Sequence, residues 1–172
     1  MNKLTPTFQE AINVTSIWNS AWDRGELSDE VLADRVSELL ETINGARGFL
    51  AISLSSNSPL MDRLPEALVF QLRDAGEVVV ELVSKNLAMS TAMALHHERN
   101  NDFKQQAGSE NIKRRCLELL RLLEPHSVKE TLESLLKATE GEGKYADFLN
   151  RWGYDKAQKL KIAECIYSIS QI

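Results

Sequence analysis

Hydrophobic residues recur at helical spacing along most of the chain, and two-residue alternation is absent. The clearest case begins at Ser28, a suitable N-cap, and its apolar residues return every three or four positions until about Asn44. A preceding amphipathic helix is predicted from Thr5 as N-cap, with Pro6 at the first helical position, to Gly25 beyond its end. The apolar positions on or near one stripe of this first helix are Phe8, Ile12, Trp18 and Trp22.

The segment at residues 46–56 is ambiguous. It is a short apolar run bounded by Gly, Ser, Asn and Pro, which fits either a buried strand or a short buried helix. A lone strand would have no partner, because no other part of the chain has the two-residue pattern. We therefore expect a short helix here.

The longest pattern starts at Pro65 and predicts a helix that runs to about Arg99, far beyond the usual length of about 11 to 12 residues. Its apolar positions alternate spacings of four and three, which is a heptad pattern. This predicted seam consists of Leu68, Leu72, Ala75, Val79, Leu82, Asn86, Met89, Met93 and His96. Most positions beside the seam are apolar or small, so the helix is expected at the centre of a bundle or in the core of a dimer.

Shorter helices are predicted over the rest of the chain. Ser109 is the expected N-cap of one that ends at Pro125, and the capping box Ser127–Glu130 opens the next. A short helix follows at about 145–152, and Asp155 caps the last one.

The sequence thus predicts an all-α fold, with about seven to eight helices around a long central helix at about 65–99. A length of 172 residues, 43% of them hydrophobic, suits one domain over residues 1–172. Cys116 and Cys165 lie within helical patterns, so we expect small buried thiols of a reducing compartment, with a disulfide as the less favoured reading. The N-terminus lacks the apolar run of an export signal, and no stretch reaches the ~20 apolar residues of a membrane span. A cytoplasmic protein without membrane partners is expected.

Charge is uneven along the chain. Residues 1–62 hold 4 basic and 9 acidic residues, so the whole net charge of −5 lies there. An acidic protein is a poor binder of nucleic acid, whose affinity comes mainly from cations that neutralise phosphates. A local basic cluster at Lys113, Arg114 and Arg115 is first of all a solvated helix face; the functional reading is a patch for an acidic partner, such as the acidic third of a second copy.

Three side chains, His96, His97 and Glu98, are the candidate metal or acid/base residues. Ligands on one helix must be three or four residues apart, and the positions at those distances from either histidine hold Met, Ala, Asn or Arg. Only Glu98 has a partner at that spacing, Asp102, and a metal there would need ligands from elsewhere. A further imidazole could come only from His126, which a hairpin would carry about 22 Å back along the long helix. The simpler interpretation is the end of a helix.

Asn86 is a polar residue at an otherwise apolar seam position, where it can fix the register of a dimer or bond a neighbouring helix. No phosphate loop, nucleophile elbow or His–Glu zinc spacing is present in the sequence, and we assign no catalytic residue and no cofactor. Two hypotheses follow. The first is a non-catalytic adaptor that binds a protein partner and self-associates as a homodimer. The alternative is a helical bundle, possibly an enzyme, that binds a metal or small ligand near His96.

Overall fold

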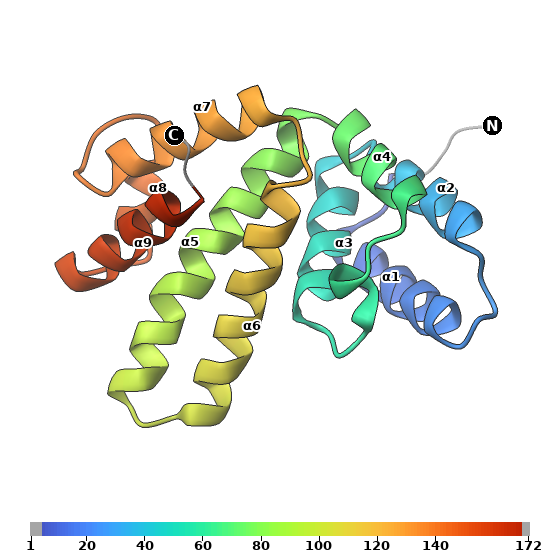
Figure 1. Ribbon diagram of the computed structural model, residues 1–172, viewed down its shortest axis with the longest axis horizontal. Helices are drawn as coiled ribbons and strands as arrows, with labels where there is room; N and C mark the ends of the chain where they lie inside the picture. The colour runs from blue at the N-terminus through green and yellow to red at the C-terminus, as the bar shows by residue number, and fades with distance from the viewer. Residues whose placement is uncertain (1–4, 170–172) are drawn as a thin grey trace. The chain divides into compact units, whose positions relative to one another are not determined.

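The computed structural model describes residues 5–169, and every regular element in that range is helical (Figure 1). The protein is all-α, as predicted. Its internal contacts divide the chain into two compact units, Met1–Leu82 and Val83–Ile172, which are described here one at a time. The single domain over residues 1–172 stays a prediction. Residues 1–4, part of the segment in which no export signal was predicted, lie outside the described range.

The first unit is built from four helices and a short 3-10 helix. These are α1 (Phe8–Asp23), α2 (Asp29–Leu39), α3 (Ile43–Ser55), η1 (Pro59–Asp62) and α4 (Glu66–Asp74), followed by the first residues of α5 (Glu77–Arg99). Within the unit, α1 packs mainly against α3, and α2 packs against α4. The largest fully buried side chains in this unit are Phe49, Leu32, Leu50, Leu54, Leu60, Leu68 and Leu72. The ambiguous segment at residues 46–56 is helical, as expected, because it forms most of α3.

The buried face of α1 differs from the predicted aromatic stripe. Its buried residues are Ala11, Thr15 and Asn19, one helical turn apart, whereas the predicted apolar residues of this helix are half-buried. The reason lies in α3, where a Cβ atom at Gly48 would overlap the Cβ of Ala11. The two helices approach so closely that only small side chains fit between them.

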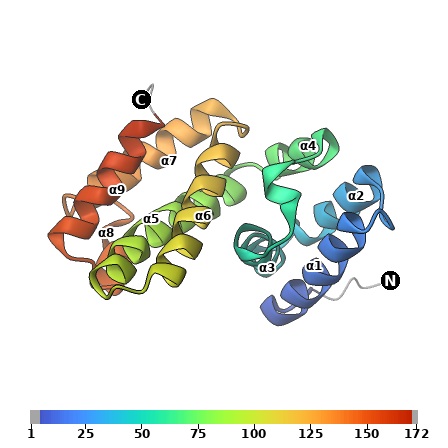
Figure 2. The same cartoon turned by 60° about the horizontal axis from the view of Figure 1, so that its bottom comes forward.

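The second unit contains most of α5 together with α6 (Phe103–Leu120), α7 (Pro125–Ala138), α8 (Ala146–Arg151) and α9 (Lys156–Ser168). Figures 1 and 2 both show α5 and α6 side by side as an antiparallel hairpin. α7 contacts both α8 and α9. The apolar core of this unit includes Leu87, Leu119, Leu120, Leu132, Leu135, Leu149, Ile162 and Ile166.

The helix predicted over about 65–99 is two helices, which corrects the sequence interpretation. Gly76 has a φ of +73°, a conformation that glycine adopts at no steric cost. Its N–H donates to the carbonyl of Arg73 at 3.0 Å, so α4 ends in a left-handed cap and α5 starts afresh at Glu77. The periodic pattern crosses this break because the glycine occupies a single position between two amphipathic helices.

The predicted seam of α5 is also displaced from its buried side. Asn86 and Met89 are half-buried, and Met93 and His96 are exposed. The buried positions are Val79, Val80, Val83, Ser84, Leu87, Ala88, Ser90, Thr91, Ala92 and Ala94. Small side chains occupy much of this face, because they permit the closest approach of neighbouring helices.

By length and composition, α5 is apolar enough to cross a membrane, and within residues 5–169 no other helix meets that test. However, 56% of its apolar window is buried inside the protein. A core helix of a soluble protein has these same properties.

The starts of α1, α6 and α7 correct three predicted N-caps. Thr7, not Thr5, caps α1 by accepting a hydrogen bond from the Glu10 N–H at 3.1 Å, so Pro6 lies before the helix. Asp102, not Ser109, caps α6 by accepting a hydrogen bond from the Gln105 N–H at 3.2 Å. Glu124 caps α7 ahead of the predicted Ser127, because its carboxylate accepts from the backbone N–H groups of two following residues. By contrast, the predicted caps of α2 and α9 are confirmed at Ser28 and Asp155.

Candidate functional site

The predicted histidine pair lies at the C-terminal end of α5. His96 and His97 are in edge-to-face contact, with ring centroids 5.4 Å apart. His96 Nε2 lies 3.3 Å from Nδ2 of Asn100, and the same amide donates to the His96 carbonyl at 3.0 Å. The Glu98 side chain is exposed. These contacts are typical of the last turn of a helix, where side chains bond otherwise unpaired carbonyls.

In the described part of the chain, no third metal ligand joins these residues. Within residues 5–169, no group of three or more His, Cys, Asp or Glu side chains is arranged to hold a metal ion. His126 lies in the first turn of α7, where its Nε2 is 3.2 Å from the Glu130 carboxylate. The structure therefore brings His96 and His97 together and pairs His126 with a residue of its own helix.

The three residues of the predicted basic cluster do not share one exposed face of α6. Lys113 lies 3.8 Å from Glu110, and Arg114 pairs with Glu118 at 3.2 Å. Arg115 is only 3% exposed, so its assignment to the solvated face was wrong. The buried side of α6 is wider than the apolar stripe in the sequence, and it takes in Arg115 beside Cys116.

A shallow groove of about 240 Å³ follows the exposed side of α6. Its lining residues are Glu110, Lys113, Arg114, Leu117, Glu118 and Arg121. Two carboxylates stand among the three cations, so the field at this surface is largely neutralised by the helix itself. The interaction role of Lys113, Arg114, Arg115 and the half-buried Asn86 stays a prediction.

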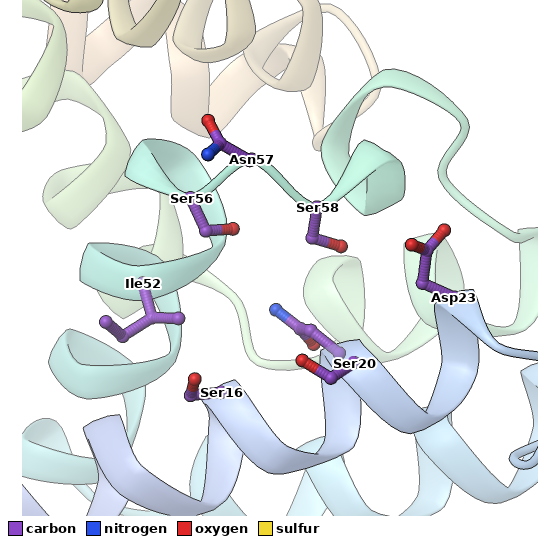
Figure 3. Close-up of a pocket in the computed structure, with 8 residues that line it drawn as sticks. Ser16, Ser20, Asp23, Ile52, Ser56, Asn57 and Ser58 are labelled. Atoms are coloured by element: carbon purple, nitrogen blue, oxygen red, sulfur yellow. The ribbon is translucent and has the colours of Figure 1, made fainter.

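A polar pocket in the first unit was not predicted from the sequence. It has a volume of about 280 Å³ and lies between α1 and the end of α3 with the loop that follows (Figure 3). The lining residues are Ser16, Asn19, Ser20, Asp23, Ile52, Ser56, Asn57 and Ser58. The four from α1 are spaced three, one and three residues apart, which places them on one side of the helix. That spacing of polar residues was the available sequence signal.

Asn19 is the deepest polar residue of this pocket. It is 2% exposed, and its Nδ2 donates to Ser53 Oγ at 3.1 Å. Its carbonyl oxygen Oδ1 is buried without a hydrogen-bond partner. Buried acceptors in folded proteins are nearly always satisfied, so this oxygen marks a place where a further donor is expected.

A second groove lies in the C-terminal unit, between the end of α7 and α9. It has a volume of about 520 Å³ and is lined by Thr139, Glu140, Gly141, Lys156, Lys159, Leu160 and Ala163. Leu160 is 60% exposed, and Tyr167, two turns further along α9, is 59% exposed. An apolar surface of this kind beside lysines suits the binding of a protein segment.

Comparison with known proteins places the chain in a family but assigns it no activity. No curated protein and no solved structure matches the chain. One family model, described as uncharacterised conserved protein UCP020893, matches residues 7–169. The match includes both compact units and all of the helices described above. The chain therefore belongs to the family of uncharacterised conserved protein UCP020893.

Proposed function

We propose that the protein is a non-catalytic, cytoplasmic interaction module that self-associates, and that α9 supplies the binding surface. The observation that carries this proposal is that α9 is apolar on two opposite sides. Its inner side consists of the buried Gln158, Ile162, Cys165 and Ile166. The apolar residues of its outer face are Leu160, Ala163 and Tyr167, spaced three and four residues apart, with Lys156 one turn before Leu160.

A helix that is apolar on opposite sides is normally buried between neighbours. In a single copy of the chain, Leu160 and Tyr167 on the outer face are more than half exposed. Burial of each such side chain in an interface stabilises the complex by about 1.5–3 kcal/mol before the cost of association. The outer face of α9 is therefore the strongest candidate for a contact between chains.

Charge favours a second copy of the chain as the partner. Lys156 and Lys159 lie beside Leu160 along the groove. In α2, Glu30 and Asp34 are exposed next to the exposed Val31. Lysines around a leucine on one copy complement carboxylates around a valine on the other. In a two-fold dimer the same contact would form twice, because each copy supplies both helices.

The two cysteines support the cytoplasmic part of the proposal. Cys116 and Cys165 are both free and buried. Burial raises the pKa of the Cys116 thiol, and the neighbouring Cys165 adds to the effect. Burial likewise raises the pKa of Cys165. Unpaired, protonated thiols in a core are typical of proteins from reducing compartments.

A charge-reversal experiment tests the proposed contact. Variant A carries Glu30→Lys and Asp34→Lys, and variant B carries Lys156→Glu and Lys159→Glu. Each variant alone brings like charges together across both contacts and is expected to weaken self-association by about tenfold or more. An equimolar mixture of A and B restores opposite charges at both contacts, so light scattering after gel filtration should detect a heterodimer.

The matched control is Lys104→Glu, which reverses an exposed charge on α6 and should leave association unchanged. The proposed contact is wrong if variant A or variant B dimerises as well as the wild type. It is also wrong if the mixture of A and B remains monomeric.

A further inference from the structure

The polar pocket of the first unit has walls of two chemical kinds. Hydroxyl, amide and carboxyl groups dominate, and Ile52 supplies the apolar side. Figure 3 shows Ser16 and Ile52 at one end of the hollow, and Asp23 with Ser58 at the other. A volume of about 280 Å³ is near the lower limit of pockets that bind small molecules, about 300 Å³. The pocket therefore suits a compact ligand of a few non-hydrogen atoms.

Asn19 sets the hydrogen-bonding character of the ligand. Its Nδ2 is already used by Ser53 Oγ, and its Oδ1 is buried and lacks a donor. Leaving such an acceptor unsatisfied costs roughly 1–3 kcal/mol. Oδ1 itself exposes almost no surface, so a bound molecule reaches it only when the Asn19 side chain turns toward the hollow. A hydrogen bond donated to Oδ1 then removes that cost.

Asp23 sets the charge of the ligand. It is the one charged side chain among the lining residues, and none of them is cationic. It lies on the same side of α1 as Asn19, four residues later. Residues 1–62 also carry the whole excess of acidic over basic residues. The negative charge around the pocket favours a cationic ligand and disfavours phosphate or carboxylate ligands.

We propose that this pocket binds a small hydroxylated primary amine, with the Asn19 Oδ1 and the Asp23 carboxylate as acceptors for its ammonium group. An ammonium group carries three donors, enough to bond both acceptors at once. The serine hydroxyls of the lining accept from or donate to the ligand hydroxyl, and Ile52 packs against its carbon chain.

The experiment is an NMR titration of the full chain with ethanolamine at pH 7, followed through backbone and side-chain amide signals. Saturable shifts are expected for residues 16–23 and 52–58, together with the side-chain amide of Asn19. Ethylene glycol, which lacks the ammonium group, should bind at least about tenfold more weakly than ethanolamine, and glycolate should not bind.

Two matched variants identify the site. Asp23→Asn preserves the size of the side chain but removes its charge, and it should weaken ethanolamine binding by about tenfold. Asp74→Asn makes the same change at an exposed position of α4 outside the pocket, and it should have no effect on ethanolamine binding. The proposal is overturned if ethanolamine gives no saturable shifts up to about 50 mM, because the affinity would then be negligible. Equal binding by Asp23→Asn, or binding of glycolate, overturns it as well.

Discussion

The side-chain amide of Gln158 donates a hydrogen bond of 3.1 Å to the backbone carbonyl of Ala92, across 66 positions of sequence. Through its other atom, Oε1, the same side chain accepts from the Asp155 N–H at 2.9 Å. Gln158 therefore completes the capping box of α9 and attaches that helix to α5 at the same time. Gln158 thus contributes to holding α9, and with it the outer face of that helix, against α5.

Gln158→Glu is expected to separate these two roles. Glutamate preserves the acceptor of the capping box but loses the N–H donor to Ala92, and it places a carboxylate beside a buried carbonyl oxygen. We expect the free energy of unfolding to fall by about 1–3 kcal/mol. The measurement is urea unfolding followed by circular dichroism. Unchanged stability would show that the Ala92 contact contributes nothing.

The pair Asp155 and Arg99 makes α9 sensitive to acid. Arg99 Nη1 donates to the Asp155 carboxylate at 2.6 Å, and this hydrogen bond, with that from the Gln158 N–H, holds the pKa of Asp155 below its usual range. The stabilisation is present above the ordinary aspartate pKa of about 3.9 and is lost as pH falls through the lowered value.

The variant Asp155→Asn tests that pH dependence. Asparagine still caps the helix, but it does not titrate. The difference in Tm between wild type and variant should be small because both partners are exposed, and it should shrink as pH falls below about 4. A difference that grows at low pH would contradict the lowered pKa. The measurement is calorimetry over that pH range.

Two glycine substitutions should have opposite effects on stability. Alanine at Gly48 would overlap Ala11 at the crossing of α1 and α3, so Gly48→Ala should destabilise the protein by about 1–3 kcal/mol. Gly108 lies within α6 with open space around its Cα, so Gly108→Ala should stabilise it by about 0.5–1 kcal/mol. Chemical denaturation of both variants checks the prediction. Similar shifts of one sign would refute the close crossing of α1 and α3.

The break between α4 and α5 can be tested by whether one substitution, Gly76→Ala, stabilises or destabilises the protein. At φ +73°, alanine is strained, so Gly76→Ala should destabilise the protein by about 1–2 kcal/mol. In a continuous helix the same substitution would stabilise by roughly 1 kcal/mol. Stabilisation would therefore support one continuous helix over residues 65–99 and contradict the break at Gly76.

Helix content was predictable from the sequence because local signals determine it. Ser28 and Asp155 cap α2 and α9 as predicted, since a capping side chain and its N–H partners lie within four residues. The starts of α6 and α7 were misplaced because Asp102 and Glu124, whose carboxylates also accept from backbone N–H groups, come earlier in the chain. Which of two nearby residues caps a helix depends on the packing of the whole helix, and a short sequence motif does not encode that packing.

Burial and the candidate site were harder to predict, because both depend on which helices meet. The sequence placed Arg115 on a solvated face, and it is buried. The sequence also made the aromatic residues of the first helix its inner stripe. The close approach at Gly48 instead selects small and polar residues, including Asn19. The pocket beside Asn19 lies between α1 and the end of α3, so it depends on how these helices meet, and its residues had no sequence signal except their spacing.

The proposed self-association is tested most directly by sedimentation equilibrium of the wild type, Leu160→Ser and Ile17→Ser. Leu160 lies on the outer face of α9, whereas Ile17 is similarly exposed, at 65%, on α1. At about 100 µM, where a complex with a Kd of about 10 µM is mostly dimeric, we expect twice the chain mass for the wild type and Ile17→Ser. Leu160→Ser should sediment as a monomer. A monomeric wild type, or a Leu160→Ser variant as dimeric as Ile17→Ser, would contradict the account.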